Sequence, residues 1–144
     1  INYRGGTVLP NKDIMKLDAD ILIPAAIPNL IIAGDVDSVK AKLIVEGSNI
    51  PMDAQTEMLL HRKGVTVIPD FVANAGGVIS SYIEYIGGKE KEMFKLVEKK
   101  IIRNTNLILE KSDRQTTPRD AAMEIAMERV LAECKICKVE PKRR

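Results

Sequence analysis

The sequence predicts an α/β fold in which three parallel strands with crossover helices are followed by C-terminal helices. Three short apolar runs lack any polar alternation, which is typical of strands buried on both faces of a parallel sheet. Helical patterns separate these runs, and the connections between parallel strands should be right-handed. Longer helical patterns fill the second half of the chain, so we expect an αβ part over about residues 1–75 and a helical part over 76–135.

Local signals place the elements of the first half. Strands are expected at residues 20–24, 43–46 and 65–68, and short helices at residues 11–17 and 36–42. We expect Asn11 to cap the first of these helices, and Asp53 to cap a longer helix that runs to about Lys63. Gly64 then supplies the left-handed backbone conformation that commonly follows a helix.

The second half is predicted to be helical throughout. Helices are expected at residues 76–86, 90–111 and 118–135. The paired glycines Gly87 and Gly88 should end the first of them, and Thr117 followed by Pro118 is a typical helix start. The basic stretch 136–144 is expected to be a solvated tail.

Composition excludes several classes of protein. The 144 residues are 45% apolar and 29% charged, as in ordinary globular proteins, and the net charge of +2 is too small to predict binding to nucleic acid. No apolar run approaches the roughly 18–20 residues that span a membrane. Cys134 and Cys137 supply only two of the four ligands of a structural zinc site, so we expect reduced thiols, no metal site and a cytoplasmic protein. The first residue is not Met, which suggests a piece of a longer chain.

Three loops that follow the predicted strands should meet at one edge of the sheet, where ligands bind in open α/β folds. Asn49 and Asn74 lie in two of these loops, and each amide can match a carboxamide such as that of nicotinamide. Ser81 lies one turn into the next helix and could donate to a carboxylate. Taken singly, each asparagine could equally be a turn-former, the serine could bond its own helix, and Asp70 could simply brace the loop.

The glycine fingerprint of a dinucleotide fold, G-x-G-x-x-G, is absent from the chain. That fingerprint belongs to the first half of such a domain. If this is a Rossmann-type dinucleotide-binding domain, we therefore expect only its second half here. The sheet would then expose an edge with which the missing strands should pair.

Several blocks in a fixed order carry a resemblance to a known family. They are residues 20–27 (DILIPAAI), 44–49 (IVEGSN), 68–78 (IPDFVANAGGV) with Ser81, Tyr82 and Glu84, and 119–122 (RDAA) with residues 125–130. In this order they resemble the C-terminal portion of glutamate dehydrogenase, in the superfamily of glutamate, leucine, phenylalanine and valine dehydrogenases. The resemblance covers roughly residues 11–135.

The resemblance implies an NAD- or NADP-dependent conversion of L-glutamate to 2-oxoglutarate and ammonia. It implies that Ala25 and Ala26 line the adenosine-ribose side of the cofactor cleft, and that Asn49 and Asn74 lie by the nicotinamide ribose and carboxamide. Ser81 would bind the side-chain carboxylate of the substrate. The neighbouring serine points roughly 100° away on the helix, so only one of the two can face the cleft. Homo-oligomers, usually hexamers, are implied as well.

The family's catalytic lysine and aspartate lie in an N-terminal substrate domain that this chain lacks, so no catalytic residue is expected here and the chain alone should have no turnover. One loop departs from the family, because Ile50 replaces a glycine at a turn that is expected to take a positive φ, and this puts the contact of Asn49 with the cofactor in question. Two alternatives stay open. The chain could be a non-catalytic packing or regulatory module with a relic site, or part of a leucine- or phenylalanine-type dehydrogenase.

Overall fold

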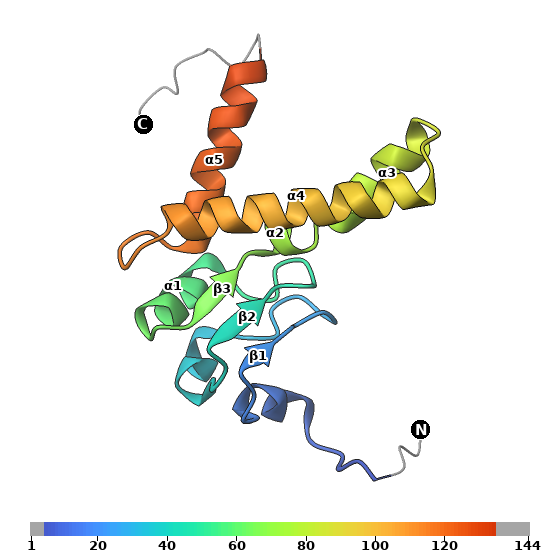
Figure 1. Ribbon diagram of the computed structural model, residues 1–144. Helices are drawn as coiled ribbons and strands as arrows, with labels where there is room; N and C mark the ends of the chain where they lie inside the picture. The colour runs from blue at the N-terminus through green and yellow to red at the C-terminus, as the bar shows by residue number, and fades with distance from the viewer. Residues whose placement is uncertain (1–4, 135–144) are drawn as a thin grey trace. The chain divides into compact units, whose positions relative to one another are not determined.

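The computed structural model describes residues 5–134, so the basic tail at 136–144 lies outside the described residues (Figure 1). The chain divides into two compact units, Ile1–Asn74 and Ala75–Arg144. The first unit contains a parallel sheet with short helices, and the second is built from helices. Among the described residues, no helix combines the length and the apolar character that crossing a membrane requires.

The first unit is built on a three-stranded sheet. Its strands β1 (Ile21–Leu22), β2 (Leu43–Val45) and β3 (Thr66–Ile68) lie in the order β1-β2-β3. Both pairs are parallel, and Ile44 at the centre of β2 lies opposite Val67 of β3. The predicted α/β class with three parallel strands is therefore confirmed, although each strand is shorter than its apolar run.

Two 3-10 helices precede the longer helices, and both differ from the prediction. The helix η1 (Asn11–Lys16) begins after Pro10 without a side-chain cap, so the expected capping role of Asn11 is wrong. The helix η2 (Ala33–Ser38) begins earlier than the expected range of 36–42 and also ends earlier, within that range. Both are tight 3-10 turns, whose short length leaves little helical periodicity to detect in the sequence.

The helix α1 (Ala54–Arg62) begins and ends as the sequence predicts. The carboxylate of Asp53 accepts a hydrogen bond from the Thr56 N–H at 2.7 Å, and this capping lowers the pKa of Asp53. Gly64 has a φ of 91°, the left-handed conformation that ends many helices. Between these two signals the helix presents Leu60, which is fully buried, to the core.

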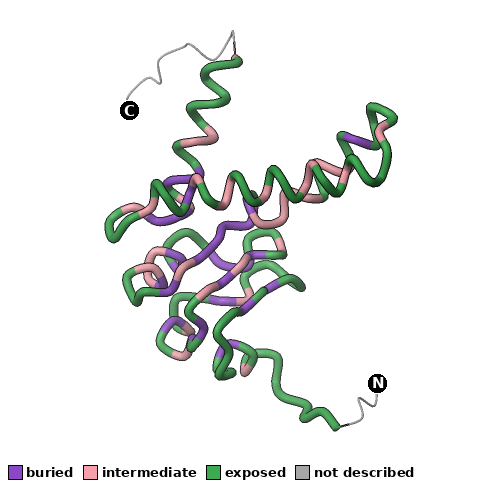
Figure 2. Tube along the Cα trace, viewed as in Figure 1, coloured by how far each residue is buried: buried purple, intermediate pink, exposed green. Residues whose placement is uncertain are grey.

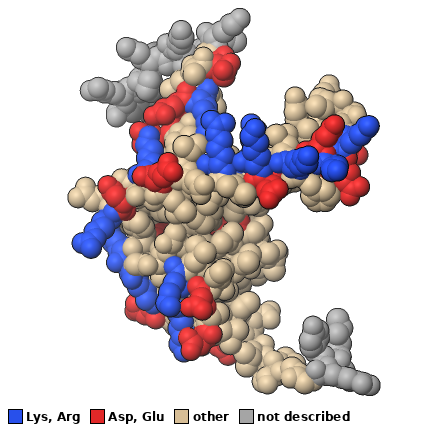
Figure 3. All heavy atoms as spheres, viewed as in Figure 1, with Lys and Arg blue, Asp and Glu red and all other residues tan. Residues whose placement is uncertain are grey.

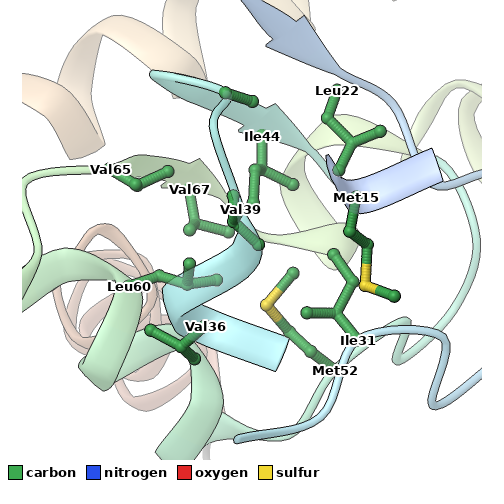
Figure 4. Close-up of a cluster of buried hydrophobic side chains, with 11 residues drawn as sticks. Met15, Leu22, Ile31, Val36, Val39, Ile44, Met52, Leu60, Val65 and Val67 are labelled. Atoms are coloured by element: carbon green, nitrogen blue, oxygen red, sulfur yellow. The ribbon is translucent and has the colours of Figure 1, made fainter. Parts of the chain in front are cut away.

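The core of the first unit lies between the sheet and its helices (Figure 4). It consists of aliphatic side chains and methionines: Met15, Leu22, Ile31, Val36, Val39, Ala41, Ile44, Met52, Leu60, Val65 and Val67. Burial is concentrated along β2 and β3 (Figure 2). The edge strand β1 departs from the expectation of burial on both faces, because Ile21 is 54% exposed and its neighbour Ile23 is 59% exposed.

The second unit consists of α3 (Gly76–Tyr85), α4 (Glu90–Lys111) and α5 (Pro118–Glu133), in which α4 packs against both of the others. The end of α3 is a Schellman motif: the Gly87 N–H donates to the Glu84 carbonyl and the Gly88 N–H to the Ile83 carbonyl. A Cβ on Gly88 would lie 2.6 Å from a methyl carbon of Ile83, so only glycine fits there. The predicted ending at the paired glycines is confirmed.

The last helix begins with the predicted cap. The Thr117 hydroxyl accepts from the Asp120 N–H at 3.1 Å and Pro118 occupies the first turn. Lys111 at the end of α4 lies 2.8 Å from Glu124 of α5, and this hydrogen-bonded ion pair raises the pKa of Lys111. Cys134, just after α5, is disulfide-bonded, which corrects the expectation of a reduced thiol there; Cys137 lies outside the described residues.

Candidate functional site

The loops that follow β1 and β2 are joined to each other at the carboxyl end of the sheet. The Pro24 carbonyl accepts hydrogen bonds from the Gly47 N–H at 3.0 Å and from the Ser48 N–H at 2.9 Å. A Cβ on Gly47 would lie 3.0 Å from the Cβ of Ala25, so the absence of a side chain lets the two loops meet. The sheet geometry thus brings two of the three predicted loops into direct contact.

The third loop reaches the second through the two predicted asparagines. The Asn74 Nδ2 group donates to Oδ1 of Asn49 at 2.7 Å, although 25 residues separate them in the chain. Asn74 is the C-cap of the short helix α2 (Asp70–Ala73), which only Pro69 separates from β3, and Asn49 lies in the exposed loop after β2. In the described part of the chain, no protein group bonds Nδ2 of Asn49 or Oδ1 of Asn74. The Nδ2 donor group of Asn49 and the Oδ1 acceptor of Asn74 are therefore left for a ligand, and a primary carboxamide offers the complementary acceptor and donor.

Ala25 and Ala26 lie in the exposed loop after β1, as expected for residues that a flat ligand approaches. Ala26 also lines an open cavity of about 440 Å³ whose walls are largely apolar. The lining residues are Thr7, Leu9, Pro10, Asn11, Ile14, Leu17, Ala26, Ile27 and Leu30. The hollow therefore lies between the segment that precedes β1 and the loop that contains Ala26.

The turn at Ile50 has the strained backbone that its departure from the family predicts. Ile50 has a φ of 49°, in the left-handed region that a β-branched residue rarely adopts. Its N–H donates to Oδ2 of Asp70 at 2.9 Å, and its carbonyl accepts from the Asn29 N–H, also at 2.9 Å. The turn thus has a positive φ in spite of its side chain, and Asn49 accepts a hydrogen bond from Asn74; its contact with a cofactor stays a prediction.

Two buried carboxylates support the loops from beneath. Glu46 is fully buried at the end of β2, and its Oε2 accepts from the Asp70 N–H at 2.8 Å. Asp70 is 8% exposed and holds the Ile50 N–H, which agrees with the bracing role that the sequence left open for it. The sequence analysis did not single out Glu46. An acidic residue at the end of a buried strand could have indicated such a role, because a buried charge must find hydrogen-bond partners.

Ser81 lies in the second unit, on the exposed side of α3. Its hydroxyl donates to the Gly77 carbonyl one turn earlier at 3.1 Å, which is the back-bonded state that a serine within a helix often adopts. Ser80, which is half-buried, donates to the Gly76 carbonyl. The two serines therefore differ in exposure, and Ser81 is the more accessible.

The remaining charged groups add no further candidate to the site. Basic side chains gather along α4 in the second unit on the face that Figure 3 shows, with acidic side chains among them. Within residues 5–134, no group of three or more His, Cys, Asp or Glu side chains could hold a metal ion. The candidate site of the first unit therefore rests on two amides and on the two carboxylates beneath the loops.

Sequence comparison identifies a family and relatives to which this chain is similar. Residues 2–136 match the profile of the Glutamate/Leucine/Phenylalanine/Valine dehydrogenase family. A glutamate dehydrogenase from Aeropyrum pernix is 39% identical over 94% of this chain, and an NADP-specific glutamate dehydrogenase from Saccharolobus shibatae is 38% identical over 91%. The chain spans only about a third of these relatives, 35% of the first and 33% of the second.

Solved structures agree with this relationship. An L-tryptophan dehydrogenase from Nostoc punctiforme matches 89% of this chain and 39% of its own chain, with a TM-score of 0.79 and 32% identity. A hetero-hexameric glutamate dehydrogenase from Thermus thermophilus matches 95% of this chain and 35% of its own chain, with a TM-score of 0.80; at 23% identity it supports the fold alone. The chain therefore belongs to the glutamate, leucine, phenylalanine and valine dehydrogenase family.

Proposed function

We propose that the chain is the C-terminal cofactor-domain segment of an NAD(P)-dependent glutamate dehydrogenase. The parent protein would convert L-glutamate, NAD(P)+ and water into 2-oxoglutarate, ammonia and NAD(P)H. The observation that carries this proposal is the Asn49–Asn74 amide pair at the carboxyl end of a parallel sheet. Its support is the family match together with relatives named glutamate dehydrogenase at 38–39% identity.

The polar groups of the first unit fit the nicotinamide end of the cofactor. A primary carboxamide could accept from Nδ2 of Asn49 and donate to Oδ1 of Asn74, the atoms that the asparagine pair leaves available. Ala25 and Ala26 would border the adenosine ribose, since they offer only small exposed side chains. When bound, the nicotinamide would take up the hydride that leaves the α-carbon of the amino acid.

Ser81 would select the substrate. Its hydroxyl would exchange the bond to the Gly77 carbonyl for one to the side-chain carboxylate of glutamate. A hydrogen bond to a charged group contributes about 1.5–3 kcal/mol, so its loss should weaken substrate binding by tenfold or more. None of the groups described in this chain would abstract a proton from the substrate, and we assign the proton-transfer groups to the part of the parent protein outside it.

The test uses the full-length protein that carries this chain, with L-glutamate and each of NAD+ and NADP+, followed by absorbance of the reduced cofactor. We expect turnover with glutamate, and no turnover from the 144-residue chain alone. Replacing Ser81 by Ala should raise the KM for glutamate at least tenfold, whereas Ser80→Ala, one residue away, should leave it near the wild-type value. An unchanged KM in the Ser81→Ala protein would reject the assigned role.

A second candidate is a dehydrogenase for an apolar amino acid, which the match to L-tryptophan dehydrogenase at 32% identity favours. The same assay run with L-tryptophan, L-leucine, L-phenylalanine and L-valine separates the two, since a higher kcat/KM with any of these than with glutamate selects the second candidate. A full-length protein that binds cofactor and oxidises no amino acid would instead indicate a non-catalytic module. Cytoplasmic location and a hexameric assembly remain part of this proposal.

A further inference from the structure

Asp70 connects the two asparagines of the candidate site through its own backbone and side chain. Its Oδ2 accepts from the N–H of Ile50, the residue directly after Asn49, at 2.9 Å. Its carbonyl accepts from the N–H of Asn74 at 2.8 Å. One residue therefore fixes the backbone on both sides of the Asn49–Asn74 hydrogen bond, which lies at 2.7 Å.

Asp70 is itself held in place. It lies two residues after the end of β3, its N–H donates to Oε2 of the fully buried Glu46 at 2.8 Å, and only 8% of its surface is exposed. Carboxylates buried to this degree are costly unless hydrogen bonds compensate the lost solvation. Because Asp70 is anchored to the ends of β2 and β3 rather than to a mobile loop, its carboxylate is a fixed point for the turn at Ile50.

The turn needs such a fixed point. Ile50 adopts a φ of 49°, and strained backbone of this kind persists only where the surroundings over-determine it. Without the bond to Asp70, Ile50 would be free to relax to a negative φ, which would rotate the preceding peptide and carry Asn49 away from Asn74. The amide pair would then lose the geometry that a carboxamide requires.

We propose that Asp70 is a positioning residue that holds Asn49 against Asn74, through the Ile50 N–H, for recognition of a nicotinamide carboxamide. This inference rests on the proposed function, because it presumes that the amide pair binds the nicotinamide end of NAD or NADP. Asp70 touches neither the cofactor nor the substrate in this role. Its effect is on cofactor affinity through the shape of the loop.

The experiment measures the dissociation constants of NADH and NADPH by fluorescence titration of the full-length protein that carries the chain. Asp70→Ala should raise the dissociation constant of the preferred cofactor by about 10- to 100-fold, the fold-change that corresponds to losing one hydrogen bond to a charged group. Asp70→Asn keeps an accepting oxygen and should stay within about threefold of wild type. The matched control is Asp35→Ala, because Asp35 also accepts a backbone N–H from an isoleucine, Ile32 at 3.1 Å, and should leave affinity unchanged.

A second substitution separates positioning from direct contact. Glycine adopts a positive φ without a steric cost, so Ile50→Gly in the Asp70→Ala protein should recover part of the lost affinity. A double variant that binds no better than Asp70→Ala would overturn the inference, as would an Asp70→Ala protein with wild-type affinity. Should Asp70→Ala not fold, Asp70→Glu moves the carboxylate by one methylene and should weaken binding several-fold; unchanged affinity there would also overturn it.

Hydrogen exchange gives a readout that does not depend on cofactor binding. Deuterium uptake by a peptide that contains Ile50 should be slow in the wild-type protein and faster in the Asp70→Ala protein, and equal uptake contradicts the inference. A wild-type protein that binds neither NADH nor NADPH would sink the proposed function. Wild-type binding with no effect of Asp70→Ala would sink only the positioning role.

Discussion

The left-handed turn at Ile50 predicts that glycine stabilises the folded state more than alanine does at this position, the reverse of the usual order. We compare Ile50→Gly with Ile50→Ala, because both remove the exposed part of the side chain and only alanine keeps the Cβ. In the left-handed region a Cβ costs about 1–2 kcal/mol. Glycine instead lowers the free energy of unfolding by about 0.4–1 kcal/mol relative to alanine, because the unfolded chain is more flexible. The glycine variant should therefore be the more stable of the two by about 0.8 kcal/mol.

An exposed isoleucine in extended backbone provides the control. Ile21 lies in β1 and is 54% exposed, against 57% for Ile50, so the two sites lose similar side-chain surface. In a strand, glycine is less favourable than alanine by about 0.5–1 kcal/mol. Glycine should therefore be more stable than alanine at position 50 and less stable than alanine at position 21. The glycine-minus-alanine difference in the free energy of unfolding should differ between the two sites by about 1.5 kcal/mol, roughly a tenfold change in the folding equilibrium.

Urea unfolding of the 144-residue chain followed by circular dichroism measures both pairs. With a slope of about 2 kcal/mol per molar urea, the Ile50 pair should differ in midpoint by about 0.4 M. The slopes must agree within a pair for the midpoints to report stability alone. If Ile50→Ala proves more stable than Ile50→Gly by the margin found at Ile21, the turn is not strained in solution and the reasoning fails.

Three further predictions concern the packing of the first unit. The Nζ group of Lys63 donates to three backbone carbonyls, two in η2 and one in the residue after it, at 2.7 to 3.1 Å. Lys63→Met should therefore lower the free energy of unfolding, measured by urea titration, by about 2 kcal/mol. The control Lys42→Met removes only an exposed ion pair and should lower it by less than about 0.5 kcal/mol. Leu60 is fully buried, and Leu60→Ala should cost about 2–5 kcal/mol by calorimetry or urea, an effect that a loosely packed core would not show. Hydrogen bonding from Thr56 lowers the pKa of Asp53 below its ordinary value of 3.8. The stabilisation of the folded state by the ionised Asp53 is therefore complete above about pH 4 and is lost as the pH falls through the lower pKa of the folded state. The difference in urea midpoint between wild type and Asp53→Ala should close in that acid range, and a difference that widens there would contradict the assignment.

Local signals in the sequence were sufficient to predict the helices whose ends carry a capping side chain or a glycine. Asp53 and Thr117 cap helices because their side-chain oxygens reach N–H groups three residues on, which is a contact within one turn. Gly64 and Gly87 end helices because both take a positive φ. The parallel sheet followed from short apolar runs separated by helices, a pattern that the burial of Ile44 and Val67 explains. For the helix starts and ends, the cause lies within a few residues.

The parts that the sequence did not predict depend on contacts between distant residues. The helix α2 (Asp70–Ala73) is too short to show a period, and it forms where Asp70 is held by Glu46, 24 residues earlier. The hydrogen bond between Asn49 and Asn74 could be expected only from the convergence of strand ends, and its length and direction come from the structure. The roles of these asparagines, of Ala25 and Ala26, and of Ser81 stay predictions that the proposed assays address.

Backbone strain in the described residues is confined to one place, and that place is the candidate site. The only non-glycine residues with a positive φ between residues 5 and 134 are Asn29 and Ile50, and the Asn29 N–H donates to the Ile50 carbonyl. Asparagine tolerates this conformation, but a β-branched residue does not, so the strain is concentrated at Ile50. Strained residues cluster at ligand sites because the surrounding contacts that hold them also hold functional groups. Here those contacts come from Asp70 and Asn29, and the group that they hold is Asn49; an ordinary surface loop would have relaxed or would carry glycine.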